Sequence, residues 1–179
     1  NLKKNIDRGK TAYTFALGSK KLYDWIDNNR CLASYNVENA NHPLRLAQMD
    51  NLVSINSALQ IDLYTQVNAE STGFKQISGN GGLMDFVQGA YWSKGGRSLI
   101  CMPSTYTKKD GTLVSKIIPS FEEGSIVTIP RQMVHIVVTE YGSFSMKVTS
   151  TWMRAERIIA LAHPDFRDEL IREAEKMNI

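Results

Sequence analysis

Apolar residues occur in short runs that turn-forming residues separate, and the pattern within each run predicts a strand or a helix. Apolar or alternating runs predict strands at 11–17, 31–37, 97–102, 114–118, 126–128 and 134–139, and a strand pair within 52–62. Helices are predicted at 19–28, 43–48, 83–91 and 150–162, with a last helix beginning at His163-Pro164. Strands and helices therefore alternate along the chain.

Residues that favour helix starts support several of these helices. Ser19 and Ser150 are candidate N-caps, and Pro43 suits the first turn of a short helix. Asp168 and Arg172 in the last helix have the i,i+4 spacing of an ion pair. Three apolar side chains of the helix at 19–28 are expected on one face: Leu22, Trp25 and Ile26.

Several predicted strands are apolar throughout, which is typical of strands in the interior of a parallel sheet. Because such strands alternate with helices, we predict an α/β fold with an open, mostly parallel sheet flanked by helices. In sheets of this kind, binding sites form beyond the carboxyl ends of the strands. Three polar loops follow strands and are expected to converge: Asn41-His42, Gly79 to Gly82, and Thr139 to Gly142.

The loop Gly79-Asn80-Gly81-Gly82 carries the most informative local pattern. Glycine admits backbone conformations that other residues avoid, and it lets a ligand approach the main chain. A helix that begins just after this loop adds free N–H groups and the positive end of its dipole, which suit an anion or a developing oxyanion. On local sequence alone, a tight turn that needs positive φ at Gly82 is the simpler explanation.

The composition is that of a globular chain long enough for one domain, with 179 residues, 42% hydrophobic and 22% charged. The net charge of +3 is small, and no basic cluster with interleaved aromatic residues indicates nucleic acid. No apolar run approaches the ~18 residues that span a bilayer, and no signal-peptide pattern opens the chain. Cys31 and Cys101 form no C-x-x-C pattern, so we expect buried thiols in a reducing, cytoplasmic protein.

The three histidines do not indicate a metal site or a catalytic triad. His135 alternates with apolar residues on a predicted strand and is expected to be structural, and His163 precedes a helix-starting proline. With no cysteine partner and no clustered carboxylates, we assign no metal. Ser93-Lys94-Gly95-Gly96 lacks the spacing of a phosphate-binding P-loop.

A series of motifs extends over essentially all 179 residues. In order they are Asn41-His42-Pro43, Asn51 to Ala58 with Asp62-Leu63, Gly79 to Ala90, Ser93 to Ser98, Pro103-Ser104-Thr105, Val137 to Gly142, and Ala162 to Arg167. Together they resemble the C-terminal domain of the acetyl-CoA hydrolase/CoA-transferase family. The similarity is greatest to its 4-hydroxybutyrate and butyrate CoA-transferase branch. Each motif alone is common, but all of them in this order are specific.

The resemblance implies an open α/β domain of the CoA-transferase type, within a longer polypeptide that has two such domains. In this family a glutamate attacks an acyl-CoA and forms a mixed anhydride. The released thiolate then attacks that anhydride, which produces a glutamyl-CoA thioester. An acceptor carboxylate reverses the sequence. In the sequences of this family, that glutamate lies upstream of the segment that matches this chain. Because the chain starts at Asn1 and not at Met, we interpret it as a piece cut from a longer protein. The resemblance implies that residues 1–179 are a single C-terminal domain, which is inactive alone because the nucleophilic glutamate is missing.

The resemblance assigns catalytic roles to Gly82, Asn41 and Glu140. The Gly82 N–H is the candidate oxyanion donor for the thioester carbonyl. Asn41 matches an active-site asparagine whose amide can donate to a carboxylate or carbonyl, although a helix cap before His42 is an alternative role. Glu140 matches a second carboxylate of the family, which positions the nucleophilic glutamate or tunes its charge by shifting its pKa. The alternative role for Glu140 is an ion pair, for example with Arg154.

For coenzyme A itself, the resemblance points to Leu59, Ser78, Gly82 and a lysine after Pro103-Ser104-Thr105. Lys108 and Lys109 both fit that position; we choose Lys108 as a phosphate contact, with a solvated loop charge as the alternative. The implied substrates are a short-chain acyl-CoA and acetate or a similar acid. The implied partners are the N-terminal catalytic domain of the same polypeptide and further copies in a homo-oligomer, with no nucleic acid and no membrane.

The sequence departs from the family pattern at several loop positions. Thr65 and Val148 stand where glycine is usual, Gln88 stands where arginine is usual, and Ser143-Phe144 replaces a small pair. These departures bear on the acyl substrate more than on the class of reaction. Two other functions stay open: an acyl-CoA hydrolase that uses water as the acceptor, and a non-catalytic module that binds CoA or a nucleotide.

Overall fold

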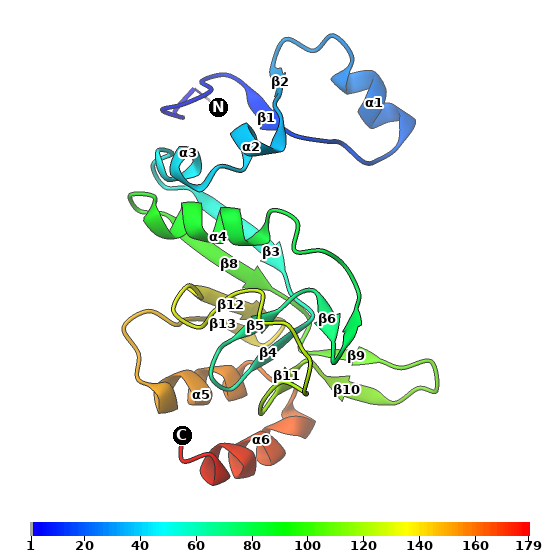
Figure 1. Cartoon of the computed structure of the whole chain (residues 1–179), viewed down its shortest axis with the longest axis vertical. Coiled ribbons are helices and arrows are strands. Elements are labelled where there is room, and N and C mark those ends of the chain that lie inside the picture. The colour runs from blue at the N-terminus through cyan, green and yellow to red at the C-terminus, as the bar shows by residue number, and fades with distance from the viewer. Residues whose placement is uncertain (1) are drawn as a thin grey trace.

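The computed structural model describes residues 2–179, and Figure 1 shows the arrangement of their elements. The helices are α1 (Lys20–Ile26), α2 (Val37–Ala40), α3 (Pro43–Ala47), α4 (Leu83–Trp92), α5 (Thr151–Ala160) and α6 (Pro164–Lys176). The strands are β1 (Thr11–Tyr13), β2 (Leu32–Ser34), β3 (Val53–Ser57), β4 (Gln60–Asp62), β5 (Val67–Asn68), β6 (Ser71–Thr72), β7 (Lys75–Gln76), β8 (Arg97–Cys101), β9 (Thr105–Thr107), β10 (Leu113–Ser115), β11 (Ile117–Ile118), β12 (Ile136–Thr139) and β13 (Gly142–Ser145).

The central sheet has 4 strands in the order β13-β12-β8-β3. Strands β3, β8 and β12 are parallel, and β13 returns antiparallel to β12. Their register places Leu99 of β8 between Ile55 of β3 and Ile136 of β12. The structure therefore confirms the predicted α/β fold with an open, mostly parallel sheet.

Helices pack against this sheet and enclose the core. Helix α4 runs along β3 and β8, while α5 and α6 lie toward the other end of the molecule (Figure 1). Val87 of α4, Ile100 of β8, Val137 of β12 and Ile158 of α5 are at most 1% exposed and belong to one apolar cluster. The buried faces of four elements thus meet in a single core.

Several predicted strand segments differ from what forms. The segment at 114–118 divides into β10 and β11, which belong to different sheets. Strands β3 and β4 both appear within 52–62, but β3 pairs with β8 in the central sheet and β4 pairs with β11 and β5 in a smaller one. The segment at 126–128 is not a strand; the Thr128 N–H instead donates to the Val67 carbonyl, next to an isolated bridge between Val67 and Ile129. Local alternation indicates strand character, but residues far along the chain decide the pairing.

The N-terminal segment lies apart from the core (Figure 1). The predicted strands at 11–17 and 31–37 shorten to β1 and β2, which pair with each other in parallel. Helix α1 forms where predicted, but it buries no residue, and Trp25 of its expected apolar face is 55% exposed. Ser19 takes the N-cap position without a side-chain hydrogen bond.

The predicted starts of the other helices are confirmed. Ser150 caps α5 by accepting a hydrogen bond from the N–H of Met153. Pro43 and Pro164 occupy the first turns of α3 and α6, where a missing N–H removes no intrahelical bond.

Two predictions about single side chains are wrong. Cys31 is exposed, because its carbonyl pairs with Thr11 at the peripheral β1–β2 pair rather than in the core; Cys101 is half-buried. Asp168 and Arg172 are both exposed on α6 and form no ion pair, as expected where water solvates each charge well.

Candidate functional site

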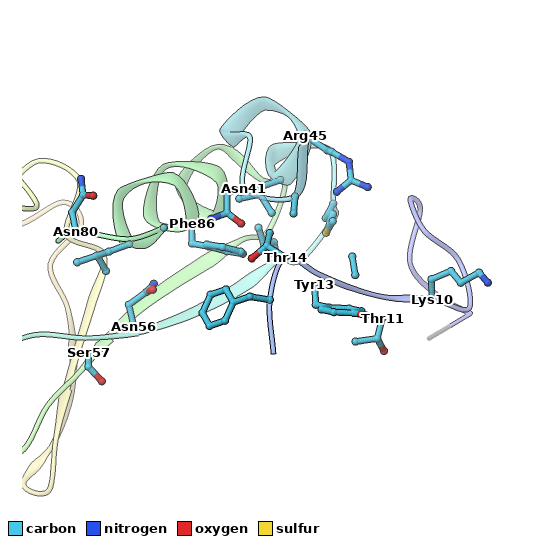
Figure 2. Close-up of a pocket in the computed structure, with 18 of the residues that line it drawn as sticks. Lys10, Thr11, Tyr13, Thr14, Asn41, Arg45, Asn56, Ser57, Asn80 and Phe86 are labelled. Carbon is cyan, nitrogen blue, oxygen red and sulfur yellow. The ribbon is translucent and has the colours of Figure 1, made fainter. Parts of the chain in front are cut away.

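A cavity of about 780 Å³ opens between the N-terminal segment, helices α2 and α3, and the start of α4 (Figure 2). Asn41 and Gly82 are two of the residues predicted at the site, and both line it. Apolar and aromatic groups form much of the remaining wall, including Tyr13, Phe15, Leu46, Met49 and Phe86. The structure therefore brings together two of the three polar loops that the sequence analysis singled out.

Gly82 is the N-cap of α4, and its small size is needed because Asn41 lies against it. A Cβ added to Gly82 would stand 2.5 Å from Asn41 Nδ2, closer than side-chain carbons approach. The φ of Gly82 is −89°, so the explanation by a positive-φ turn is wrong for this residue; Gly81 has the positive value, 53°. Close approach between a backbone and a side chain is thus the reason for glycine here.

The same two residues offer hydrogen-bond donors that the described part of the chain leaves unused. No described residue accepts from the Gly82 N–H, and the Asn41 side-chain amide has no protein partner among residues 2–179. Asn41 ends α2 through its backbone, and His42 caps α3 through Nδ1, so the alternative of Asn41 as a side-chain helix cap is wrong. A backbone N–H at a helix start and a neighbouring amide can bind one oxygen or two adjacent oxygens.

The cations that line the cavity are engaged within the chain. Arg45 pairs with Asp7 at 2.6 Å, and Lys10 donates to the carbonyl of Arg30. Lys4 donates to the carbonyl of Lys10 at 3.1 Å. The unused donors identified in this cavity are therefore the neutral groups of Asn41 and Gly82, together with the buried Nη1 of Arg45, which has no hydrogen-bond partner in the described structure.

Two predicted CoA-binding residues lie near the cavity without lining it. Ser78 is exposed, precedes the glycine loop and donates through Oγ to the carbonyl of Ala69, at 3.3 Å. Leu59 follows the end of β3, and its N–H donates to the carbonyl of Asn68. Ala69 itself lines the cavity, so Ser78 is tied to its wall.

Lys108 lies away from these residues. It follows β9 and is exposed on the connection to β10, in a hairpin that projects from the body of the molecule (Figure 1). Its N–H donates to the carbonyl of Thr112, which closes the hairpin. Lys109 is exposed on the same connection, so this structure gives no reason to prefer one lysine over the other.

Glu140 does not line the cavity either; it borders a shallower depression at the ends of β8 and β12. Its carboxylate accepts hydrogen bonds from Ser104, through the N–H at 2.9 Å and the hydroxyl at 2.5 Å. The alternative of an ion pair with Arg154 is wrong, because Arg154 donates to Thr65 Oγ1 and to the carbonyl of Arg131. Desolvation would raise the pKa of Glu140, but hydrogen bonds, led by that from the Ser104 hydroxyl, and the nearby His163 together hold that pKa below its ordinary value.

Sequence reasoning missed two residues beside this carboxylate. Ser104 belongs to the motif Pro103-Ser104-Thr105, which the sequence analysis used only to find a lysine. Lys116 lies between β10 and β11 and is half-buried; desolvation lowers its pKa, and attraction to Glu140 opposes that shift. A partner 36 residues away leaves no local pattern, so only the fold could place Ser104 at Glu140.

Two of the departures from the family pattern have unusual backbone geometry. Thr65 and Val148 stand where the family usually has glycine, and both have left-handed φ values, 66° and 56°. β-Branched residues rarely adopt this conformation. A family glycine at each position is therefore explained by the backbone, and this chain accepts strain there.

The remaining features concern metal binding, membrane spanning and the start of α6. Within residues 2–179, no group of three or more histidine, cysteine, aspartate or glutamate side chains is arranged to hold a metal ion. In the same range, no helix is long and apolar enough to cross a bilayer. His163 caps α6 through Nδ1, as its place before Pro164 predicts.

The sheet topology defines an α/β domain. Its similarity to the crystal structure of a 4-hydroxybutyrate CoA-transferase from Porphyromonas gingivalis confirms the predicted CoA-transferase type, with a TM-score of 0.80 at 37% identity over 98% of this chain and 39% of that one. The chain belongs to the acetyl-CoA hydrolase/transferase family, because residues 18–174 match the model of that family's C-terminal domain. It is 54% identical over 177 residues to the probable butyrate:acetyl-CoA coenzyme A-transferase of Syntrophomonas wolfei subsp. wolfei, covering 99% of this chain and 39% of the relative.

Two further comparisons agree with this family. A 4-hydroxybutyrate coenzyme A transferase of Clostridium kluyveri is 47% identical over 98% of the chain and 40% of the relative. The crystal structure of RipA from Yersinia pestis superposes with a TM-score of 0.90 at 48% identity, over 99% of this chain and 39% of that one. The predicted resemblance to the butyrate and 4-hydroxybutyrate branch is confirmed. The chain spans about 40% of the length of these relatives.

Proposed function

We propose that this chain is the C-terminal domain of a two-domain acyl-CoA:carboxylate CoA-transferase. The enzyme exchanges CoA between a short-chain acyl-CoA and acetate or a similar acid in the cytoplasm. One observation carries the proposal: the unused N–H of Gly82 and the unused amide of Asn41 lie side by side in a cavity with apolar and aromatic walls. Names of relatives that cover the whole chain support the same reaction.

The reaction needs a donor pair of this kind. A glutamate of the upstream domain attacks the thioester carbon, CoA leaves as a thiolate, and a mixed anhydride forms. The thiolate then attacks the glutamyl carbonyl of that anhydride, which releases the donor acid and leaves a glutamyl-CoA thioester. An acceptor carboxylate reverses both steps. In each step negative charge develops on a carbonyl oxygen, where the Gly82 N–H stabilises it by about 3 kcal/mol and Asn41 orients the reacting carboxylate.

The remaining predicted residues have secondary roles in this proposal. Ser78 and Leu59 lie beside the cavity and contact the pantetheine arm of CoA, and Lys108 binds a phosphate from the projecting hairpin. Glu140 supplies a second carboxylate that tunes the nucleophile when the upstream domain closes over this one. CoA is thus a substrate of the enzyme. We also propose that the whole polypeptide assembles as a homo-oligomer.

A direct assay of the full-length polypeptide tests the proposed reaction. Butyryl-CoA is incubated with and without acetate, and acyl-CoA esters and free CoA are separated and quantified. We expect acetyl-CoA to form only with acetate and free CoA to stay near background. Release of free CoA at a comparable rate without acetate would contradict the transferase and identify a hydrolase, the other activity in the family's name.

The isolated domain provides the second half of the test. We expect residues 1–179 to show no acyl exchange, because the nucleophile is upstream, and activity to return in the full-length polypeptide. If the full-length protein binds CoA but exchanges no acyl group with any short-chain acid, a non-catalytic binding module is the correct description.

A further inference from the structure

The carboxylate of Glu140 is held by a residue from a different part of the chain. Ser104 donates its backbone N–H to Oε2 at 2.9 Å and its hydroxyl to Oε1 at 2.5 Å. Ser104 is fully buried at 0% exposure, whereas Glu140 is exposed. The hydrogen bonds therefore reach the carboxylate from the protein side and leave its other side open to the depression.

Both residues are fixed by further hydrogen bonds. The carbonyl of Ser104 accepts from the N–H of Lys116 at 2.8 Å, and the carbonyl of Lys116 accepts from Ile61 of β4. Thr139, which precedes Glu140, donates through its hydroxyl to the carbonyl of Leu161 at 2.8 Å. The smaller sheet thus anchors Ser104 and the end of α5 anchors Glu140, so the pair meets in one geometry.

Charged and titratable groups surround the pair on several elements. Half-buried Lys116 faces it from the β10–β11 connection, and His163 faces it from the start of α6. Cys101 of β8 borders the same depression, and the Arg167 guanidinium lies over the Tyr141 ring at 5.3 Å. The cationic neighbours favour an ionised Glu140, in the same sense as the Ser104 hydrogen bonds.

We infer that Ser104 is a positioning residue of the CoA-transfer reaction, which fixes the Glu140 carboxylate in one orientation at the ends of β8 and β12. The inference rests on the proposed function and on the role proposed there for Glu140. Two donors from one rigid residue restrict both oxygens of the carboxylate, which a single hydrogen bond does not do. Because Ser104 is fully buried, it acts through Glu140 and not on the substrate itself.

The test compares Ser104→Ala with a matched control in the full-length enzyme. Ser98 is buried on β8, and none of residues 2–179 forms a hydrogen bond with its hydroxyl, so Ser98→Ala removes a buried hydroxyl away from Glu140. We expect Ser104→Ala to lower kcat about tenfold and to move the acidic limb of the rate profile upward by roughly half a pH unit or more. Ser98→Ala should stay within about twofold of the parent enzyme at every pH.

A double-mutant cycle separates positioning from a general structural role. In a Glu140→Gln background, Ser104→Ala should cause little further loss, because the group through which it acts is already neutral. If Ser104→Ala does not fold, Ser104→Cys, which has a similar volume and a weaker donor, replaces it in the same cycle. An equal loss in both backgrounds, or an unchanged pH profile with intact Glu140, would overturn the inference. A parent enzyme without acyl exchange would instead overturn the proposed function.

Discussion

Gly82 and Asn41 approach so closely that a Cβ on the glycine would stand 2.5 Å from Asn41 Nδ2. Each residue therefore limits the other: the glycine leaves room for the amide, and the amide sits beside the Gly82 N–H. The contact joins the loop after β7 to the turn between α2 and α3, which are about forty residues apart in sequence.

Replacing Gly82 by alanine should reduce turnover far more than stability. The new methyl group displaces Asn41 and disturbs both donors, so we expect kcat of the full-length enzyme to fall about 100-fold, as when an oxyanion donor is lost. The melting temperature should change by only a few degrees, since Gly82 is at the edge of the core. Gly79→Ala is the matched control, because Gly79 lies in the same loop and an added Cβ would meet no heavy atom within 4 Å apart from its own chain neighbours. Parallel losses of rate and melting temperature in Gly82→Ala would indicate a structural role.

Gly89→Ala should destabilise the protein although it lies within helix α4. Alanine normally stabilises a helix relative to glycine by about 1 kcal/mol. Here the added Cβ would stand 2.4 Å from the Cβ of Leu46, which is 2% exposed, so α3 and α4 must move apart. We expect a net loss of about 1–3 kcal/mol in the free energy of unfolding, measured by urea denaturation. A gain in stability would show that the α3–α4 packing adapts without cost.

Val148→Gly should stabilise the protein. Val148 is fully exposed at a φ of 56°, so the substitution relieves backbone strain without removing a buried contact. Glycine also gains entropy in the unfolded chain, which offsets part of the relieved strain. We therefore expect a net gain of about 0.5–1 kcal/mol in the free energy of unfolding, seen as a higher melting temperature.

Thr65→Gly provides the comparison for Val148→Gly. Thr65 has a similar φ of 66°, but its hydroxyl accepts a 2.6 Å hydrogen bond from Arg154, and the residue is buried. The loss of that bond should cancel or exceed the relief of strain. Equal gains at both positions would contradict the role assigned to the Arg154 contact.

His135 should contribute to acid sensitivity. Burial, and then the nearby Lys147 and Arg97, lower the pKa of His135, and its buried Nδ1 has no hydrogen-bond partner in the described structure. The unfolded chain therefore takes up this proton more readily than the folded one. The stability contributed by neutral His135 is present above the unfolded pKa of about 6.5 and is lost as the pH falls below it.

Thermal unfolding at two pH values checks this expectation. Between about pH 7.5 and about pH 5.5, the melting temperature of His135→Gln should fall less than that of the parent protein. Lys147→Gln, which removes one of the repelling charges, should lie between the two. The same fall in all three proteins would show that other groups determine the acid response.

The elements that the sequence predicts well are those fixed by neighbouring residues. Ser150 before α5, Pro43 in α3 and the glycines before α4 act within one helical turn, and each helix begins where they indicate. The separation of β3 from β4 was not predictable in this way, because each strand takes its partners from residues far along the chain.

The candidate site shows the same division between features set by neighbouring residues and features set by contacts far along the chain. Asn41 and Gly82 were identified by resemblance, but the collision that requires glycine is a contact in space and leaves no local pattern. The alternative of an ion pair between Glu140 and Arg154 is wrong, because the fold directs Arg154 to Thr65 instead. Ser104 was found only once the ends of β8 and β12 were placed side by side.

The residues on either side of Glu140 are both attached to the C-terminal helices. Thr139 is hydrogen-bonded to the carbonyl of Leu161 at the end of α5, and the Arg167 guanidinium of α6 lies over the ring of Tyr141. A deletion or fusion that shifts α6 would therefore reach the carboxylate without altering any residue of the cavity. Helix α6 is consequently an unsuitable attachment point for affinity tags or reporters, however exposed its outer face is.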